Sequence, residues 1–172
     1  MPMNNKETLK ECSFLPHDRP NKLIFLLHGY GDNADNFIHI ASALHKPDWQ
    51  ANYIALNAPS KIPNYPLGRE WFNLYPNGIY ITEAGAEEIN TIKFEVQVAL
   101  NKIKNTIKNF TDRFSLKFSD CFVVGFSQGG MMTFELGDYL DQQLGGLAMI
   151  SGRIFDKRVI NNVNFLQTPF FI

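Results

Sequence analysis

The sequence has 172 residues, of which 45% are apolar and 19% charged, so it is long enough for one domain with a sizeable core. Sixteen basic and seventeen acidic residues leave a net charge of -1 without a basic stripe, which argues against a nucleic-acid partner. No apolar run approaches the roughly 20 residues of a membrane span, and the N-terminus lacks the apolar core of a signal peptide. Cys12 and Cys121 have neither metal-ligand spacing nor the pattern of a disulfide framework. We therefore expect a single cytoplasmic domain over residues 1–172.

The first part of the chain predicts an edge segment, a buried strand and a helix. Residues 1–20 are polar and carry Pro16 and Pro20, so we expect a loop or a loosely held edge strand without chemistry of its own. Residues 21–27 form an apolar run typical of a buried strand, which leads directly into His28-Gly29-Tyr30-Gly31-Asp32. Two glycines two residues apart allow a backbone path that points N–H groups at a ligand. Asp32 or Asn33 is predicted to cap the helix that follows, whose apolar face consists of Phe37, Ile40, Ala41 and Leu44.

The middle and the end of the chain continue this alternation of strands and helices. We expect a strand at 52–57, a loop rich in proline, glycine and tyrosine at 60–77, and a long amphipathic helix at 82–110. Within the loop, Trp71 and Phe72 are interpreted either as the lining of an apolar pocket or as packed anchors. Later strands are predicted at 145–150 and from 168 onward. Strands that alternate with helices indicate a mostly parallel sheet covered on both faces.

The most informative stretch is the one around Ser127. Residues 121–124 predict a buried strand, and Gly125-Phe126-Ser127-Gln128-Gly129 fits G-x-S-x-G. In that pattern the serine sits on a sharp strand-to-helix turn, and the glycines remove Cβ atoms that would collide as strand and helix close on each other. The following helix would place its N-terminal N–H groups where an oxyanion forms, which suits acyl transfer. The alternative interpretation of the pentapeptide is a glycine-rich turn with an inert serine.

Together these motifs resemble the phospholipase/carboxylesterase family of α/β hydrolases, which includes acyl-protein thioesterases and small bacterial carboxylesterases. The matching segments are Leu26 to Asp32, Ala58-Pro59, Arg69 to Leu74, and Gly125 to Gly130. The resemblance implies an α/β-hydrolase fold with a mostly parallel sheet, and small-molecule esters or thioesters as substrates, without a metal or an organic cofactor.

The resemblance also implies residue roles. Ser127 would be the nucleophile, the backbone N–H groups of Tyr30 and Gln128 would form the oxyanion hole, and Trp71 would belong to the substrate-binding region. His28 would be a structural partner of the oxyanion loop.

One part of the family pattern has no match. In α/β hydrolases an acid and then a histidine follow the serine, whereas His17, His28, His39 and His45 all precede Ser127. Asp138, Asp141 and Asp156 follow it, but we interpret each as a surface carboxylate or a helix cap. We therefore expect a domain that is incomplete at its C-terminus and lacks the last strand or strands, the last helix, the acid and the histidine. Residues 168–172 would then form an exposed edge strand through which copies self-associate.

Four hypotheses remain open at this point. The first is a serine carboxylester or thioester hydrolase by descent that is weak or inactive as this chain. The second is a non-catalytic protein, derived from a hydrolase, that binds acyl ligands or acts as an interaction module. The third is a split enzyme whose acid and histidine come from another polypeptide. In the fourth, His28 serves as the base that takes the Ser127 proton.

Overall fold

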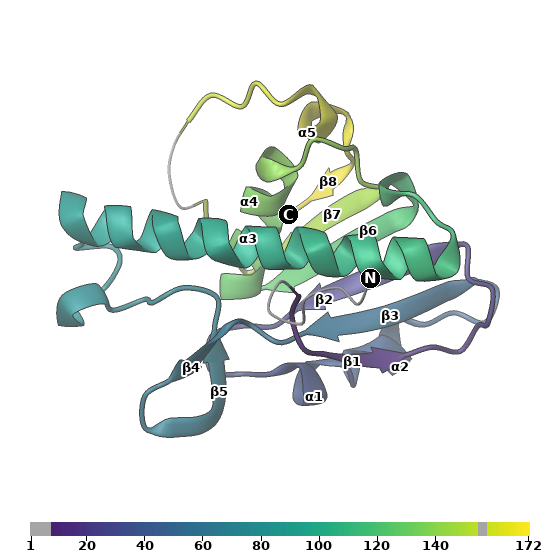
Figure 1. The fold of residues 1–172 in the computed structure, drawn as a ribbon, viewed down its shortest axis with the longest axis horizontal. Helices are drawn as coiled ribbons and strands as arrows, with labels where there is room; N and C mark the ends of the chain where they lie inside the picture. Colours follow the sequence, from purple (N-terminus) through teal and green to yellow (C-terminus); the bar gives the residue numbers. More distant parts are fainter. Residues whose placement is uncertain (1–7, 155–157) are drawn as a thin grey trace, which may run out of the picture.

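The structure, a computed structural model, describes residues 8–154 and 158–172. Its centre is a six-stranded sheet in which neighbouring strands are parallel, except that the first strand of the chain pairs antiparallel with its neighbour (Figure 1). From edge to edge the strands are β1 (Glu11–Phe14), β3 (Ala51–Leu56), β2 (Lys22–Leu27), β6 (Cys121–Phe126), β7 (Gly146–Ile150) and β8 (Phe170–Phe171). The prediction of a mostly parallel α/β sheet is confirmed, and of the two alternatives for residues 1–20 an edge strand forms at β1.

The two central strands, β2 and β6, form because their sequences are almost continuously apolar. Such runs suit strands that are covered on both faces. Leu23 and Phe25 of β2 are completely buried, as is Val123 of β6. The parallel register pairs Leu27 with Gly125, so the end of β2 lies beside the end of β6. This register brings the motif that follows β2, around Gly29 and Gly31, and the motif around Ser127 together at the carboxyl ends of the two strands.

Helices cover the two faces of the sheet unequally. The long helix α3 (Ala86–Phe114) runs across one face in front of the strands (Figure 1), and it shares a core with α4 (Gln128–Tyr139) and α5 (Val163–Gln167). The shorter helices α1 (Ala34–Phe37) and α2 (Ile40–Leu44) cover the other face, where they pack against the β2–β3 part of the sheet.

Part of that second face remains open to solvent. The side chains of β6 and β7 alternate, and those that do not face the α3–α4 core include Phe126 and Ile150, which are register partners. They are 44% and 49% exposed, and Phe171 of β8, which pairs with Ala148, is 65% exposed. We call Phe126, Ile150 and Phe171 the apolar strip.

Two sequence predictions are wrong in detail. The segment 60–77 is not a plain loop, because β4 (Ser60–Ile62) and β5 (Tyr65–Glu70) form an antiparallel hairpin in which Asn64 takes a positive φ of 60°. Asparagine tolerates this conformation better than most residues, so it can complete the turn.

The helix expected around residues 37–44 is divided into α1 and α2, and the predicted apolar face is incomplete because Leu44 is 39% exposed. The Asn33 side chain caps α1 as predicted, accepting a hydrogen bond from the Asn36 N–H.

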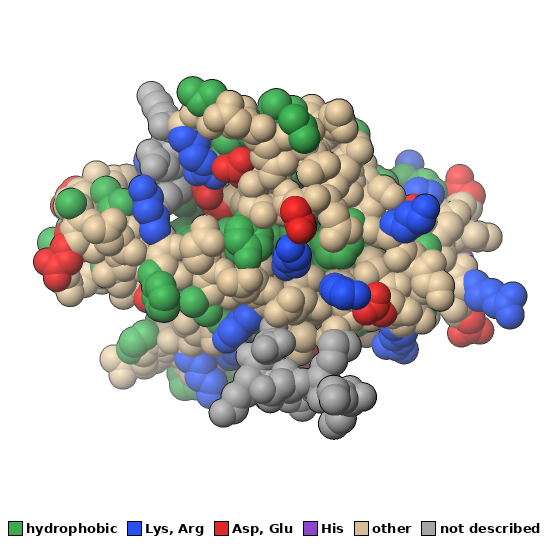
Figure 2. Space-filling view, turned by 45° about the horizontal axis from the view of Figure 1, so that its top comes forward, with side chains coloured by type: hydrophobic (Ala, Val, Ile, Leu, Met, Phe, Trp, Pro, Cys, Tyr) green, Lys and Arg blue, Asp and Glu red, His purple; other side chains and the backbone are tan. Residues whose placement is uncertain are grey.

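Three short elements were not predicted: the 3₁₀ helices η1 (Pro76–Gly78) and η2 (Phe118–Asp120), and α5. None of the helices in the described ranges is long and apolar enough to cross a membrane. Figure 2 shows positive and negative side chains interspersed on the face that it presents.

Candidate active site

Ser127 lies at the sharp turn between β6 and α4. Its backbone has φ 53° and ψ -115°, a conformation that costs a residue other than glycine roughly 1–3 kcal/mol and is found mainly at functional sites. The surrounding backbone holds the turn, because the Ser127 N–H donates to the Ile150 carbonyl at 2.9 Å and the Met131 N–H donates to the Ser127 carbonyl at 3.0 Å. The residue is partly exposed. The sequence places this strained turn correctly.

The two glycines of the motif are required by close backbone approaches. A Cβ atom on Gly125 would lie 2.1 Å from the Gly129 carbonyl oxygen, and one on Gly129 would lie 2.1 Å from the Leu27 carbonyl oxygen. These neighbours are backbone atoms, which cannot rotate away as a flexible side chain can. The prediction that the glycines remove colliding Cβ atoms is confirmed.

The loop after β2 passes directly beside Ser127. A Cβ atom on Gly29 would lie 3.5 Å from the Ser127 Cβ, so there is little free space between the two segments. The hairpin fixes the loop, since the Gly31 N–H donates to the Arg69 carbonyl at 3.0 Å and the Arg69 N–H donates to the Asp32 carbonyl at 3.1 Å. Gly31 itself takes a positive φ of 84°.

The two N–H groups expected to form an oxyanion hole belong to Tyr30, in this loop, and to Gln128, the first residue of α4. Within residues 8–154 and 158–172, neither donates to a backbone carbonyl. For Gln128 this follows from its position, since the first N–H groups of a helix have no partner within it.

His28 is completely buried and both of its ring nitrogens are occupied. The Nδ1 atom donates to the Gly29 carbonyl at 2.7 Å, and Nε2 accepts the Ala58 N–H at 3.1 Å, which requires the neutral Nδ1–H tautomer. Burial lowers the pKa of His28, although the hydrogen bond to Gly29 opposes this effect. A ring without an accessible basic nitrogen is unsuited to accept the Ser127 proton. The hypothesis that His28 serves as the base is therefore disfavoured.

Trp71 links this loop to α4. Its Nε1 donates to the His28 carbonyl at 2.9 Å and its backbone N–H donates to the Gln128 Oε1 at 2.9 Å. The Gln128 amide also donates to the Phe72 carbonyl at 2.7 Å. Trp71 is completely buried, so of the two interpretations offered by the sequence the structure favours the packed anchor. Direct contact between Trp71 and a substrate stays a prediction. No local sequence pattern predicts the bridging role of the Gln128 side chain.

A cavity of about 220 Å³ opens beside Ser127. Its apolar wall includes Leu74, Ile81 and Met131, and its polar wall includes Ser127, Ser151 and Arg153. Neither Trp71 nor any of the four histidines is among the residues that line it.

Glu70 is a buried carboxyl group at the end of β5, next to Trp71 in the chain. Burial, together with the negative charge of Glu95, raises the pKa of Glu70 from 4.5 to about 7. Burial also raises the pKa of Tyr30, and the charge of Glu70 adds to this rise. The oxyanion loop therefore lies beside a carboxyl group that titrates near neutral pH.

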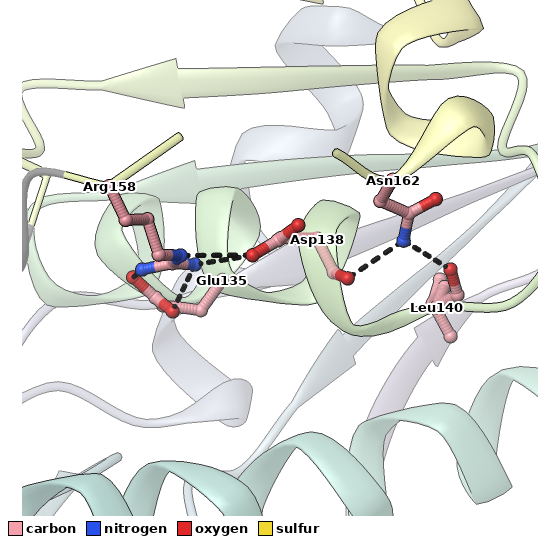
Figure 3. Close-up of polar contacts among 5 residues, drawn as sticks. All are labelled: Glu135, Asp138, Leu140, Arg158 and Asn162. Atoms are coloured by element: carbon pink, nitrogen blue, oxygen red, sulfur yellow. Dashed lines mark hydrogen bonds and ion pairs between the residues drawn. The ribbon is translucent and has the colours of Figure 1, made fainter. Parts of the chain in front are cut away.

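The acidic residues after Ser127 have structural partners elsewhere. Asp138 shares the Arg158 guanidinium with Glu135 at distances of 2.9 Å, and Asn162 donates to the Asp138 and Leu140 carbonyls (Figure 3).

Asp141 pairs with Lys104 at 2.9 Å on the surface, and Asp156 is outside the described residues. Asp141 is a surface carboxylate, as interpreted, whereas Asp138 is half-buried in an ion pair, and neither lines the cavity beside Ser127. In the part of the chain that the structure describes, no group of three or more His, Cys, Asp or Glu side chains could hold a metal ion.

A strand-to-helix turn bearing a serine, at the carboxyl edge of a mostly parallel sheet, defines an α/β-hydrolase fold. Residues 13–171 match the family model for phospholipase/carboxylesterase proteins, and the chain belongs to that family.

Among curated proteins, the chain is 25% identical over 146 residues to the uncharacterized hydrolase UM10204 of Mycosarcoma maydis, covering 83% of this chain and 53% of that protein. It thus spans about half the length of that relative.

Solved structures show the same fold at low sequence identity. Esterase PE8 superposes with a TM-score of 0.69 at 24% identity, covering 86% of this chain and 65% of that one. A phospholipase/carboxylesterase from Dyadobacter fermentans gives 0.68 at 20% identity, with coverage of 96% and 72%. SOBER1 from Arabidopsis thaliana gives 0.67 at 20% identity, with coverage of 87% and 72%.

Proposed function

We propose that this chain carries the nucleophile side of a serine carboxylester or thioester hydrolase site, with Ser127 as the nucleophile. The observation that carries the proposal is the strained turn at Ser127, held between two glycines that no larger residue can replace and opening onto a cavity. The Ser127 Oγ would attack the carbonyl carbon of a small-molecule ester or thioester and lose its proton, and collapse of the tetrahedral intermediate would release the alcohol or thiol, which takes up a proton, and leave the acyl group on Ser127. Water would then hydrolyse the acyl-serine to release the carboxylic acid.

The negative charge that develops on the carbonyl oxygen needs fixed donors. The N–H groups of Tyr30 and Gln128 lie on the two segments that meet at Ser127, and the N-terminus of the twelve-residue helix α4 adds its positive dipole end. Trp71 would act as a positioning residue, because its two hydrogen bonds tie the oxyanion loop to α4.

Serine also needs a base to take its proton and an acid to orient that base. His28 is engaged through both nitrogens, His39 is exposed on the α1–α2 side, and His17 and His45 contact each other. None of them lines the cavity beside Ser127. We therefore propose that this chain alone hydrolyses esters weakly or not at all, since removing triad members leaves about 10³ to 10⁴-fold catalysis over water.

Turnover of p-nitrophenyl acetate tests the proposal. We expect slow hydrolysis that falls to the buffer rate in Ser127→Ala. Ser151→Ala is the matched control, because it removes a hydroxyl from the same cavity wall and should keep the activity. Rapid hydrolysis that depends on Ser127 would contradict the proposal that this chain alone hydrolyses esters weakly or not at all. Saturable binding of an acyl ligand without Ser127-dependent turnover would favour the non-catalytic alternative.

We further propose a cytoplasmic location and self-association through the exposed C-terminal edge strand β8, whose Phe171 belongs to the apolar strip. Three large side chains on one open sheet face would be buried by a second copy. Light scattering should show association that Ile150→Lys reduces. Leu166→Lys, which changes a residue 67% exposed on α5 and outside the strip, should leave it unchanged. A wild-type monomer at high concentration would contradict this proposal.

A further inference from the structure

A second group of polar side chains gathers away from Ser127, under the edge of the sheet that β1 and β3 form. The rings of His17 and His45 have centroids 5.8 Å apart, and those of His45 and Tyr53 are also 5.8 Å apart. We call these three residues the imidazole cluster. The Phe14 ring packs against both His45 and Tyr53, at 5.8 and 6.0 Å, and so screens the cluster on one side.

Each member of the imidazole cluster has a polar atom that is buried without a partner. In the described part of the chain, His17 Nε2, His45 Nδ1 and the Tyr53 hydroxyl oxygen make no hydrogen bond. Tyr53 is completely buried. Buried polar groups are almost always bonded to protein, to water or to an ion. Three unpartnered atoms on three neighbouring rings therefore indicate an occupant between them.

Separate elements hold the three side chains in place before anything binds. The buried Asn52 side chain makes two hydrogen bonds to the backbone of His17. It accepts one from the His17 N–H at 3.0 Å and donates one to the His17 carbonyl at 2.8 Å. His45 ends α2, where its N–H donates to the Ala41 carbonyl at 2.8 Å. Tyr53 lies on β3 between β1 and β2. When the binding groups are already held in place, little conformational entropy is lost on binding.

The spacing of the two imidazoles suits a shared metal ion. Nitrogen–metal bonds of about 2.0–2.1 Å place the centroids of two rings that bind one ion roughly 5–6.5 Å apart, and the observed separation is 5.8 Å. Imidazole nitrogen favours zinc, copper and nickel. With no third His, Cys, Asp or Glu grouped here among the described residues, water would complete the coordination.

We propose that His17 and His45 bind a divalent transition-metal ion, represented by Zn²⁺, and that the Tyr53 hydroxyl hydrogen-bonds to a water on that ion. The Tyr53 phenol has one O–H donor and an acceptor oxygen, and its oxygen is buried without a partner among the described residues, so it can hydrogen-bond to such a water. The ion would tie the loop after β1 to the end of α2 and so stabilise the sheet edge, at a distance from the chemistry of Ser127.

Titration of the metal-free full chain with Zn²⁺, followed by calorimetry and by thermal melting, tests the proposal. The wild type should bind one ion and melt at a higher temperature when it is loaded. His17→Gln and His45→Gln should each weaken binding by about tenfold or more. His39→Gln is the matched control, because His39 is exposed and outside the cluster, and its affinity should equal that of the wild type.

A direct spectrum keeps the test decisive if a histidine variant folds poorly. Cu²⁺ bound to the wild type should show nitrogen hyperfine splitting in its electron paramagnetic resonance spectrum, and Tyr53→Phe should keep that splitting, since the phenol is not a ligand. Absence of Zn²⁺ binding by the wild type would overturn the proposal and leave a buried water as the occupant. Equal loss of affinity in His39→Gln would overturn it as well, because binding would then be at the surface.

Discussion

Replacing Gln128 by leucine tests whether one buried amide joins the nucleophile turn to the Trp71 segment. The Gln128 side chain is 2% exposed and makes two hydrogen bonds, accepting the Trp71 N–H at 2.9 Å and donating to the Phe72 carbonyl at 2.7 Å. Leucine has a similar size but can make neither bond. The Trp71 N–H would then be buried without its acceptor.

The expected loss of stability follows from these contacts. A buried Trp71 N–H without an acceptor costs about 1–3 kcal/mol, and loss of the hydrogen bond to the Phe72 carbonyl costs about 0.5–1.5 kcal/mol. We therefore expect Gln128→Leu to lower the free energy of unfolding by about 2–4 kcal/mol, a large part of the 5–15 kcal/mol that is typical of a domain.

Urea unfolding, followed by the tryptophan fluorescence to which the buried Trp71 and the exposed Trp49 contribute, measures this loss. Gln143→Leu is the matched control, because Gln143 is exposed and makes a single bond to the Gln167 carbonyl, so its loss should stay within about 0.5 kcal/mol. If Gln128→Leu were as mild as this control, the bridge would not hold the site together.

Two further predictions concern the same site. In Gly129→Ala the new Cβ would lie 2.1 Å from the Leu27 carbonyl oxygen, so we expect a loss of about 3 kcal/mol in thermal melting, whereas Gly85→Ala meets only a flexible side chain at 3.1 Å and should be mild. Equal losses in both variants would refute this. The raised pKa of Glu70, from 4.5 to about 7, means that the folded state holds an extra proton between these values, so stability falls as the pH rises through that window. Between about pH 5 and about pH 8, the free energy of unfolding should fall by about 1–2 kcal/mol more in the wild type than in Glu70→Gln, after allowance for solvent screening. Urea unfolding at the two pH values measures the difference. Parallel losses in wild type and variant would show that Glu70 is not the group responsible.

Local sequence pattern was sufficient for the central strands of the main sheet and for the nucleophile turn. The apolar runs that became β2 and β6 have no alternation, which predicts burial on both faces; this holds for β2, whereas one face of β6 is only half-buried. The glycines around Ser127 are needed for the close contact between neighbouring elements. These features depend on residues that are close in the sequence or on one backbone constraint.

Features that depend on distant partners were not predictable in the same way. Gln128 and Trp71 are 57 residues apart, and nothing in either local sequence indicates their hydrogen bond. The hairpin β4–β5 was missed because the proline and glycine in 60–77 are typical of a loop, while the turn depends on the positive φ of Asn64.

His28 shows what the fold adds to a motif. Its position after a buried strand left two roles open, a structural partner or a recruited base. The hydrogen bonds to Gly29 and Ala58, which come from opposite sides of the ring, favour the structural role.

The most direct test of the proposed chemistry is mass spectrometry of the chain after incubation with p-nitrophenyl acetate, with and without added imidazole as an external base. The proposal predicts an acetyl group on Ser127 that forms faster with imidazole and is absent from Ser127→Ala, while Ser151→Ala is still acylated at Ser127. Failure to acylate Ser127 at any imidazole concentration, in a protein that is folded, would contradict its assignment as the nucleophile.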